Sequence, residues 1–582
     1  MKQLMIFSIG PVQDFIATAR RSRDLWYGSW MLSELARVAA KTIAENKVNT
    51  LIFPADAEMD SIPNKIVAVV ETDNPKEFAE KTETAVRDTL TDTLAKTTLD
   101  AIKSKTFDRR LADAQIKDLS ELYWVSVPYN NRTYTVVRAE AEALLVARKA
   151  TRDFNQMTGA NVPKSSLDGS RESVINESEY PKNNASDKED KIRDLYEKYH
   201  ARQGERLSGV DLLKRLGARR DEPDFKSTSH MAAVPFMEKL GKAKTAKLIK
   251  DIQSVFTGKN WDIGEKDGGA LLYESRLTDW IPAGKDQNEI REAFIKIWKE
   301  YKLGESRPSP YYALLRADGD SMGEVIDGQT DEEQHRKLSK ALSEFAGKVS
   351  FLVNNEKQEN RDEKKDNKGL LIYSGGDDVL AYLPIHTVLR CAGELEKTFR
   401  EDLKEFLASK NGETITPTLS IGIVIAHHLD PLSDVLKLAR DAEHQAKDEV
   451  NGKNGLAITL SKRSGTDRTI VGKFSELYDR LTELRKLFDA KLISGGTAYE
   501  LQELNRTLSG TTIPPEGIVK EALRIVEHKK ESGGGNLSDD VKDTFKAWLE
   551  TISLDELTNE MIIAKSLADE AEPGMVKQEE QK

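Results

Sequence analysis

The chain has 582 residues, and its 98 Asp and Glu residues outnumber its 87 Lys and Arg residues, which gives a net charge of −11. This acidic balance excludes a generally basic nucleic-acid-binding surface, and a single cysteine excludes a disulfide framework. We find no secretion signal and no apolar run near the ~20 residues that span a bilayer, so we expect a cytoplasmic protein of about three to five domains.

The first 160 residues are predicted to form one α+β domain. Apolar runs predict strands over residues 4–9, 50–54, 65–70 and 122–127, with helices over 11–46 and 77–104. This β-α-β-β-α-β order is that of a ferredoxin-like unit. The tip between the paired strands, residues 55–61, carries acids but no double glycine, so we expect a solvated loop there.

Three arginines follow the first predicted strand: Arg20, Arg21 and Arg23. Guanidinium groups bind phosphate through paired hydrogen bonds, which makes these side chains candidate contacts to phosphate or RNA. A solvated helix face explains them equally well, and the sequence leaves both interpretations open.

Residues 161–300 are predicted to form a helical and irregular middle domain. Within it, residues 176–195 have the composition of a mobile surface loop. A basic cluster is interpreted as a solvated helix face rather than an RNA site; its members are Lys214, Arg215, Arg219 and Arg220.

A second ferredoxin-like unit is predicted over residues 301–465. Its strands are expected at 311–317, 369–374, 378–383 and 417–425, and its helices at 330–354, 386–409 and 432–450, with a charged loop at 354–368. We expect its first and second strands to be adjacent and central, with the end of the first beside the following hairpin. Residues 466–582 are predicted to form a helical domain with a glycine-rich break at 532–535 and a disordered tail after 571.

Acidic residues stand at two tips of this second unit. The first strand runs directly into Asp318, and the hairpin reads Ser374-Gly375-Gly376-Asp377-Asp378. The glycines allow unusual backbone angles and close approach of a ligand, and carboxylates on an exposed turn are hard oxygen ligands for Mg²⁺ or Mn²⁺ carrying a nucleoside triphosphate. The candidate catalytic and metal-binding residues are therefore Asp318, Asp377 and Asp378.

These motifs resemble the palm domains of nucleotidyl cyclases. The matching segments are LLRADGD at 314–320, SGGDD at 374–378 and AEHQAK at 442–447. The resemblance implies that Lys447 contacts phosphate, and it implies a nucleotide-binding set of Gly319, Ser374, Gly375, Gly376, Lys447 and Asp327. The hairpin ends in Asp-Asp-Val and not in Asp-Glu-Phe, which argues against an ordinary diguanylate cyclase.

The N-terminus resembles a narrower family. Residues 7–29, FSIGPVQDFIATARRSRDLWYGS, are similar to the start of the first palm in the large subunit of Cmr-type (type III-B) CRISPR effector complexes, and the similarity extends over residues 1–465. It implies two palms, ATP as substrate, a cyclic oligoadenylate as product, and partner subunits with guide and target RNA. Two alternatives stay open: adenylyl transfer to another acceptor held by the first palm, and a non-enzymatic scaffold.

Two departures from this family shape our expectations. Relatives commonly begin with an HD nuclease domain, whereas this sequence opens on the palm strand and has no His-Asp dipeptide, so we expect no DNA cleavage by this subunit. Ser165 and Asp168 stand where relatives carry a zinc-binding Cys pair, and the only cysteine is Cys391. We therefore expect no structural zinc.

Overall fold

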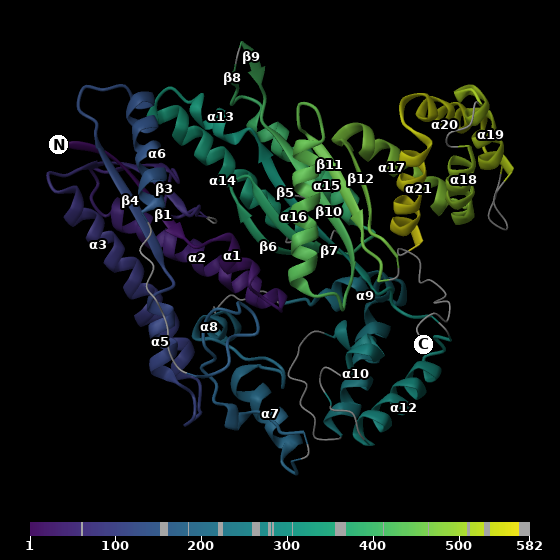
Figure 1. The fold of residues 1–582 in the computed structure, drawn as a ribbon, viewed down its shortest axis with the longest axis horizontal. Coiled ribbons are helices and arrows are strands. Elements are labelled where there is room, and N and C mark those ends of the chain that lie inside the picture. Colours follow the sequence, from purple (N-terminus) through teal and green to yellow (C-terminus); the bar gives the residue numbers. More distant parts are fainter. Residues whose placement is uncertain are drawn as a thin grey trace.

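Two large β-sheets, with helices packed around and between them, make up the fold (Figure 1). The computed structural model describes residues 1–569 apart from 60–61, 152–160, 184, 219–224, 259–267, 278–280, 282–284, 305, 355–367, 411, 464, 509–512 and 529–535. The predicted break at 532–535, the tail after 571, most of the loop 354–368, and Arg219 and Arg220 lie outside the described residues.

The first sheet has the strand order β2-β3-β1-β4. Its strands are β1 (Lys2–Gly10), β2 (Thr50–Phe53), β3 (Lys65–Glu71) and β4 (Glu121–Pro128). Its helices are α1 (Gln13–Ala17), α2 (Ser22–Ala44), α3 (Pro75–Asp88), α4 (Lys96–Asp100), α5 (Arg109–Lys117) and α6 (Tyr134–Ala150), with a π-helical segment, Thr89–Ala95, joining α3 to α4. Side chains of β1 alternate between faces, with Phe7 in the core that includes α2 and Ile6 in the core beneath α6. The predicted ferredoxin-like unit is confirmed.

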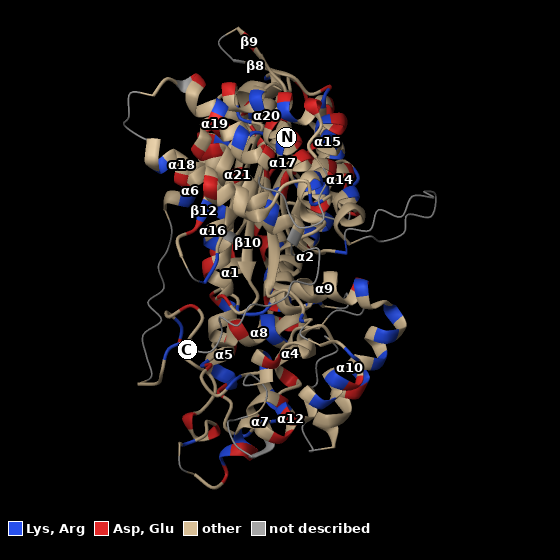
Figure 2. Cartoon of the chain, turned by 90° about the vertical axis from the view of Figure 1, so that its right-hand side faces the viewer, with Lys and Arg blue, Asp and Glu red and all other residues tan. Residues whose placement is uncertain are grey.

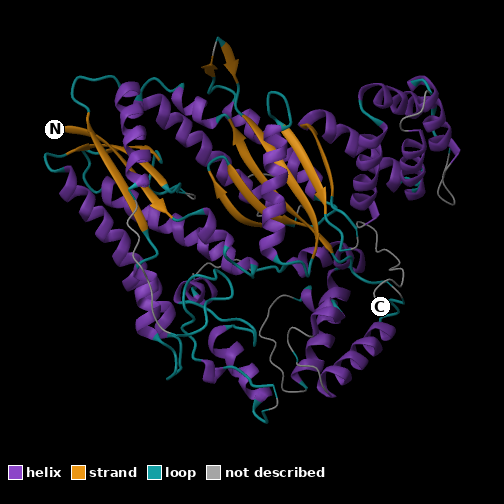
Figure 3. Cartoon of the chain, viewed as in Figure 1, coloured by secondary structure: helices purple, strands orange, loops and turns teal. Residues whose placement is uncertain are grey.

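The second sheet has the order β12-β11-β10-β5-β7-β6 and stands near the centre of the molecule (Figure 3). Its strands are β5 (Tyr311–Asp320), β6 (Leu370–Gly375), β7 (Asp378–Leu383), β10 (Thr418–His427), β11 (Gly455–Leu460) and β12 (Arg468–Lys473); β8 (Ala408–Lys410) and β9 (Glu413–Ile415) form a separate short hairpin. Its helices are α13 (Met322–Asp327), α14 (Glu332–Asn354), α15 (Val388–Leu403) and α16 (Leu432–Asp448). Both faces are buried, because Leu314 and Leu315 of β5 belong to different cores.

The expected strand order was wrong in one respect. β5 pairs with β7 and β10, and the second strand of the unit, β6, lies at the edge of the sheet. The reason is that the crossover through α14 carries the chain one position past β5, and the tight hairpin then returns β7 into the gap. The short strands β11 and β12 were not predicted, and they continue this sheet past residue 465.

The middle region is helical, with α7 (Lys188–Tyr199), α8 (Gly209–Leu216), α9 (Thr228–Leu240), α10 (Lys242–Thr257) and α12 (Lys285–Glu300), and with 3₁₀ turns at Glu177–Glu179, Ala270–Leu272 and Glu274–Arg276. The loop expected at 176–195 is wrong over its second half, because Leu195 and Tyr199 give α7 a buried face. Ser165 donates a hydrogen bond to Asp211 Oδ2 (2.7 Å) and Asp168 pairs with Arg171 (2.9 Å).

The interpretation of Lys214 and Arg215 as solvated was also wrong. Both side chains are about 1% exposed and join α8 to the first sheet's helices. The Arg215 guanidinium lies 2.8 Å from Asp24 Oδ2 and 3.1 Å from Glu205 Oε2. Lys214 donates to the carbonyl oxygens of Phe15 and Thr18. The two carboxylates neutralise the buried Arg215 charge, and the carbonyl oxygens accept hydrogen bonds from the buried Lys214 ammonium. These partners replace the water that would surround both groups on a solvated helix.

The C-terminal helices are α17 (Phe474–Asp489), α18 (Gly495–Leu508), α19 (Pro515–His528), α20 (Asp539–Thr551) and α21 (Leu554–Asp569). The predicted apolar stripe of α17 is confirmed: Phe474, Leu477, Leu481, Leu484, Leu487 and Phe488 are all buried. Arg480 of α17 and Glu560 of α21 form a buried ion pair at 2.8 Å.

The two sheets meet through a seam between the first sheet and α14. The backbone N–H of Ala55, just after β2, donates to Ser339 Oγ (2.9 Å), and Tyr134 Oη hydrogen-bonds His335 Nδ1 (2.7 Å). Ala55 is buried, so the expectation of a wholly solvated tip was wrong there, while Asp56 and Glu58 are exposed as expected.

In the cartoon of Figure 2, Lys and Arg residues are interspersed with Asp and Glu residues along the chain. Within the described ranges, we find no helix with the length and apolarity needed to cross a bilayer.

Candidate functional site at the edge of the second sheet

The structure brings the two acidic tips together at one end of β5 and β7. These strands are antiparallel, and Ala317 pairs with Val379. Asp318 follows Ala317 and Asp378 precedes Val379, so the two aspartates face each other one step beyond that pair. A Cβ on Gly319 would lie 2.7 Å from Asp377 Cβ. The hairpin therefore packs on a position where only glycine fits.

The hairpin turn is built by its glycines. Gly375 pairs with Asp378 across a two-residue turn, and Gly376 holds a φ of +77° at the first turn position, where type II′ turns favour glycine. A Cβ on Gly375 would overlap the Tyr373 hydroxyl at 1.8 Å. Asp377 and Asp378 are half-buried, so the expected exposed turn was wrong. The cause is the packing of the hairpin against Gly319.

The two hairpin carboxylates lie in an environment that disfavours their charge. Burial raises the pKa of Asp377, and the nearby Asp378 carboxylate raises it further. Burial also raises the pKa of Asp378, while the Arg316 guanidinium opposes this rise. Like charges in a partly desolvated place favour protonation or a bound cation, so this pair has the chemistry of a cation-binding site.

Lys447, on α16, reaches the same end of strands β5 and β7. Its ammonium contacts Asp318 Oδ2 and lies 3.3 Å from Glu443 Oε1 and 3.4 Å from the carbonyl oxygen of Gly319. Burial, with Lys453 and Arg316 nearby, lowers the pKa of Lys447 to about 8. The structure therefore places Lys447, the predicted phosphate contact, against Asp318, the predicted metal ligand at the end of the first strand.

Glu443 and Arg316 join the site from the side. The Glu443 side chain is only 2% exposed, and its Oε2 accepts a hydrogen bond from Arg316 Nε at 3.3 Å. Burial raises the pKa of Glu443, and Arg316 opposes this. Charges of alternating sign thus run from Asp318 through Lys447 and Glu443 to Arg316, whose positive charge also acts on Asp378.

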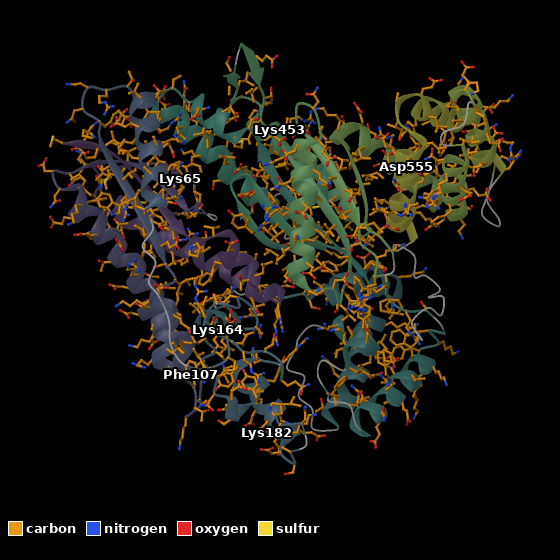
Figure 4. The ribbon with its side chains drawn as sticks, viewed as in Figure 1. Lys65, Phe107, Lys164, Lys182, Lys453 and Asp555 are labelled. Carbon is orange, nitrogen blue, oxygen red and sulfur yellow. The ribbon has the colours of Figure 1, made fainter. Side chains whose placement is uncertain are left out.

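Asp320, the second acid of the Asp-Gly-Asp motif, has a structural role. It is 2% exposed and accepts hydrogen bonds from Thr418 Oγ1 (2.7 Å), Ser420 Oγ (2.9 Å) and the Asn454 N–H (2.9 Å). These bonds hold β5, β10 and the turn before β11 together. Lys453 of that turn lies at the upper end of the second sheet in Figure 4 and donates to Ser321 Oγ (3.3 Å).

Two glycines let α16 approach the sheet closely enough to deliver Lys447. A Cβ on Gly422 of β10 would lie 2.4 Å from the backbone nitrogen of Glu443, and one on Gly455 of β11 would lie 2.0 Å from the Ala446 carbonyl oxygen. Both close contacts involve backbone atoms, which cannot rotate away.

We expect Gly422→Ala to displace α16 together with Lys447 and to lower the free energy of unfolding by about 1–3 kcal/mol, the usual cost of overpacking. Thermal unfolding measures the loss. Gly204→Ala is the matched control, because a Cβ on Gly204 has no atom within 4 Å. Unchanged stability in Gly422→Ala would contradict the close approach.

The other predicted residues lie elsewhere or make structural contacts. Asp327 is 77% exposed and pairs with Arg138 of α6 (2.8 Å), so it lies in the seam between the sheets. Arg21 donates to the carbonyl oxygen of His200 (2.7 Å) and Arg23 to that of Arg215 (2.7 Å). Arg20 is half-exposed and lies 3.7 Å from Glu205. The Ser374 hydroxyl lies 3.5 Å from the Ala346 carbonyl oxygen.

Sequence reasoning missed Arg316 and Glu443 as site residues. Both left a signal: Arg316 is a lone charge inside an apolar strand run, and Glu443 stands one helical turn before Lys447. Each is a charged residue at a position that the pattern assigns to the buried face.

The carboxylates are not gathered into a finished metal site. Within the described residues, no group of three or more His, Cys, Asp or Glu side chains is arranged to hold a metal ion. Asp318 is instead turned toward Lys447. The donor types nevertheless fit Mg²⁺, which prefers one or two carboxylates together with substrate phosphates, and the raised pKa values of Asp377 and Asp378 indicate unsatisfied negative charge.

Comparison with known proteins finds a family match for the sequence that forms each of the two sheets. Residues 311–457 match the family model of the Cas10/Cmr2 second palm domain, and residues 4–95 match that of the N-terminal region of the CRISPR-associated protein Cmr2. A curated relative, the CRISPR system Cmr subunit Cmr2 of Pyrococcus furiosus, is 25% identical over 547 residues; the match covers 80% of this chain and 62% of the relative's length.

Solved structures share the fold. A type III-B Cmr-beta structure in the apo state matches with a TM-score of 0.62 at 14% identity, covering 97% of this chain and 82% of the other. The Cmr-beta structure bound to cognate target RNA matches with a TM-score of 0.63 at 15% identity, covering 97% and 83%. The two-palm fold class predicted from the sequence is confirmed.

Proposed function

Because the chain belongs to the Cas10/Cmr2 family, we propose that it is the nucleotide-converting subunit of a type III-B CRISPR effector complex. The second sheet carries the activity in this proposal, joining ATP molecules into a cyclic oligoadenylate with release of pyrophosphate. The carrying observation is the meeting of Asp318, Asp377, Asp378 and Lys447 at one sheet edge.

Each residue has a defined task in this proposal. Asp318, Asp377 and Asp378 would hold Mg²⁺, which when bound would supply charge neutralisation of the triphosphate and would lower the pKa of the attacking 3′-hydroxyl. Lys447 balances phosphate charge from the α16 side. Gly376, where a Cβ would meet no atom within 4 Å, leaves room for the substrate to approach the backbone, whereas Asp377 and Tyr373 fill the space beside Gly319 and Gly375. The half-buried setting of the acids limits the water that screens these interactions.

Partners follow from the relatives. The Cmr-beta complex has been solved with cognate target RNA, and we propose that this chain likewise works with Cmr-type subunits, a guide RNA and a target RNA. An acidic chain of net charge −11 relies on those subunits for most of the RNA-binding surface.

The test is to incubate the assembled complex with labelled ATP, Mg²⁺ and target RNA, and to identify the product by mass. We expect oligoadenylate that depends on both Mg²⁺ and target RNA. A product carrying one adenylyl group on a different acceptor would replace the proposed reaction, and intact ATP under all conditions would favour a scaffold.

A further inference from the structure

Lys447 has two carboxylate partners of different kinds. Asp318 lies on the strand tip and is 28% exposed, whereas Glu443 lies on α16, one turn before Lys447, and is 2% exposed. The first partner is open to a ligand and the second is shielded from it.

The exposed partner, Asp318, has two competing cations. The Lys447 ammonium contacts Asp318 Oδ2, and in the proposed function the same carboxylate binds a divalent cation. A divalent cation on this carboxylate competes for its negative charge and repels the nearby ammonium, so in the proposed function the arrival of metal and triphosphate draws the lysine away from Asp318. A freed lysine has a flexible four-carbon stem and a strongly hydrated head, and nothing on Asp318 would then hold it near the phosphates.

We propose that Glu443 is a positioning residue that keeps the Lys447 ammonium at the sheet edge when metal-bound triphosphate takes over Asp318. This inference rests on the proposed function. Glu443 and Lys447 share one helix at a spacing of four residues, so the contact does not depend on the state of the strand tip.

The surroundings of Glu443 suit this task. Its Oε2 is bound to Arg316 of β5 while its Oε1 faces Lys447, so the buried charge keeps one cationic partner even when the lysine turns toward phosphate. The backbone of Glu443 lies against Gly422, and this close contact fixes the height of α16 on the sheet. A carboxylate held this firmly can orient a lysine in a way that a solvent-exposed one cannot.

The test is a double-mutant cycle on the assembled complex, with Glu443→Gln, Lys447→Met and the two combined. The first measurement is equilibrium binding of the unreactive analogue α,β-methylene-ATP with Mg²⁺. We expect Glu443→Gln to weaken binding about tenfold, the scale of one charge-assisted hydrogen bond, and Lys447→Met to weaken it at least as much. The double variant should bind like Lys447→Met alone, because Glu443 acts through Lys447.

Glu560→Gln is the matched control. Glu560 is another buried glutamate paired with an arginine, Arg480, on the C-terminal helices. We expect its loss to lower the thermal midpoint of unfolding without changing analogue binding. In turnover assays, Glu443→Gln should raise KM for ATP more than it lowers kcat.

Two results would overturn the inference: wild-type binding by Glu443→Gln while Lys447→Met is impaired, or losses that add in the double variant, as for a residue with a merely structural role. Failure of the proposed function looks different. In that case neither Lys447→Met nor Glu443→Gln changes analogue binding, and the wild-type complex forms no product.

Discussion

A complex carrying Asp377→Asn and Asp378→Asn together is expected to assemble normally and to form no oligoadenylate product. Both substitutions keep the size of the side chain and remove the charge, so the cation that carries the triphosphate would lose two of its three proposed carboxylate ligands. Since metal assistance supplies several kcal/mol of transition-state stabilisation, the loss of product should be at least about a thousandfold. Product mass after incubation with ATP, Mg²⁺ and target RNA is the measurement.

The same variant is expected to be more stable than the wild-type chain without metal. Burial raises the pKa of both aspartates above the unfolded value, which is about 3.9. Below that pH both states are protonated and the pair has no effect; as pH rises through the folded pKa, the ionised pair destabilises the folded state. The thermal midpoint of the variant should therefore exceed that of the wild type at pH 8 and match it near pH 4.

Added Mg²⁺ provides the control for this stability effect. It should raise the midpoint of the wild-type chain and leave that of the variant unchanged, because a ligand stabilises only the folded state that binds it. Full product formation by the double Asn variant would refute the assignment of the catalytic acids.

The substitution Arg215→Met is expected to be among the most destabilising single changes in the chain. Arg215 satisfies two buried carboxylates, Asp24 and Glu205, and also donates to the carbonyl oxygen of His200. Methionine fills a similar volume and leaves two carboxylates buried without their partner. Removing one member of a buried ion pair costs about 3–5 kcal/mol, and chemical denaturation measures the loss.

Arg524→Met is the control for this experiment. Arg524 pairs with Glu521 at 2.6 Å, but the arginine is 57% exposed and its partner 40%, and water solvates both groups once the pair is broken. We expect its denaturation midpoint to stay at the wild-type value. Equal midpoints for both variants would show that the Arg215 network adds little.

Periodicity and motif spacing predicted much of this fold because the information was local. The strand before Asp318, the Gly-Gly-Asp-Asp hairpin and the apolar stripe of α17 are each written in a few consecutive residues. Strand order was predicted less well, because the insertion of β7 between β5 and β6 depends on how a crossover and a hairpin compete for one position in the sheet.

The errors over charged residues have a different cause. Lys214 and Arg215 were interpreted as solvated, and Glu443 and Arg316 were not predicted as site residues, because charge in a sequence is ordinarily a sign of solvent exposure. Their burial depends on partners far along the chain, such as Asp24 for Arg215 and β5 for Glu443. No local pattern carries those pairings.

The seam at Ala55 has a consequence for the roles of the two halves. The β2–β3 connection corresponds in topology to the β6–β7 hairpin that carries Asp377 and Asp378, but its second residue, Ala55, donates its backbone N–H to Ser339 Oγ on α14. At Ala55 this connection packs against α14, so that position is not open to a substrate. In that sense the first unit supports the second mechanically, through a contact that fixes α14 beside the first sheet.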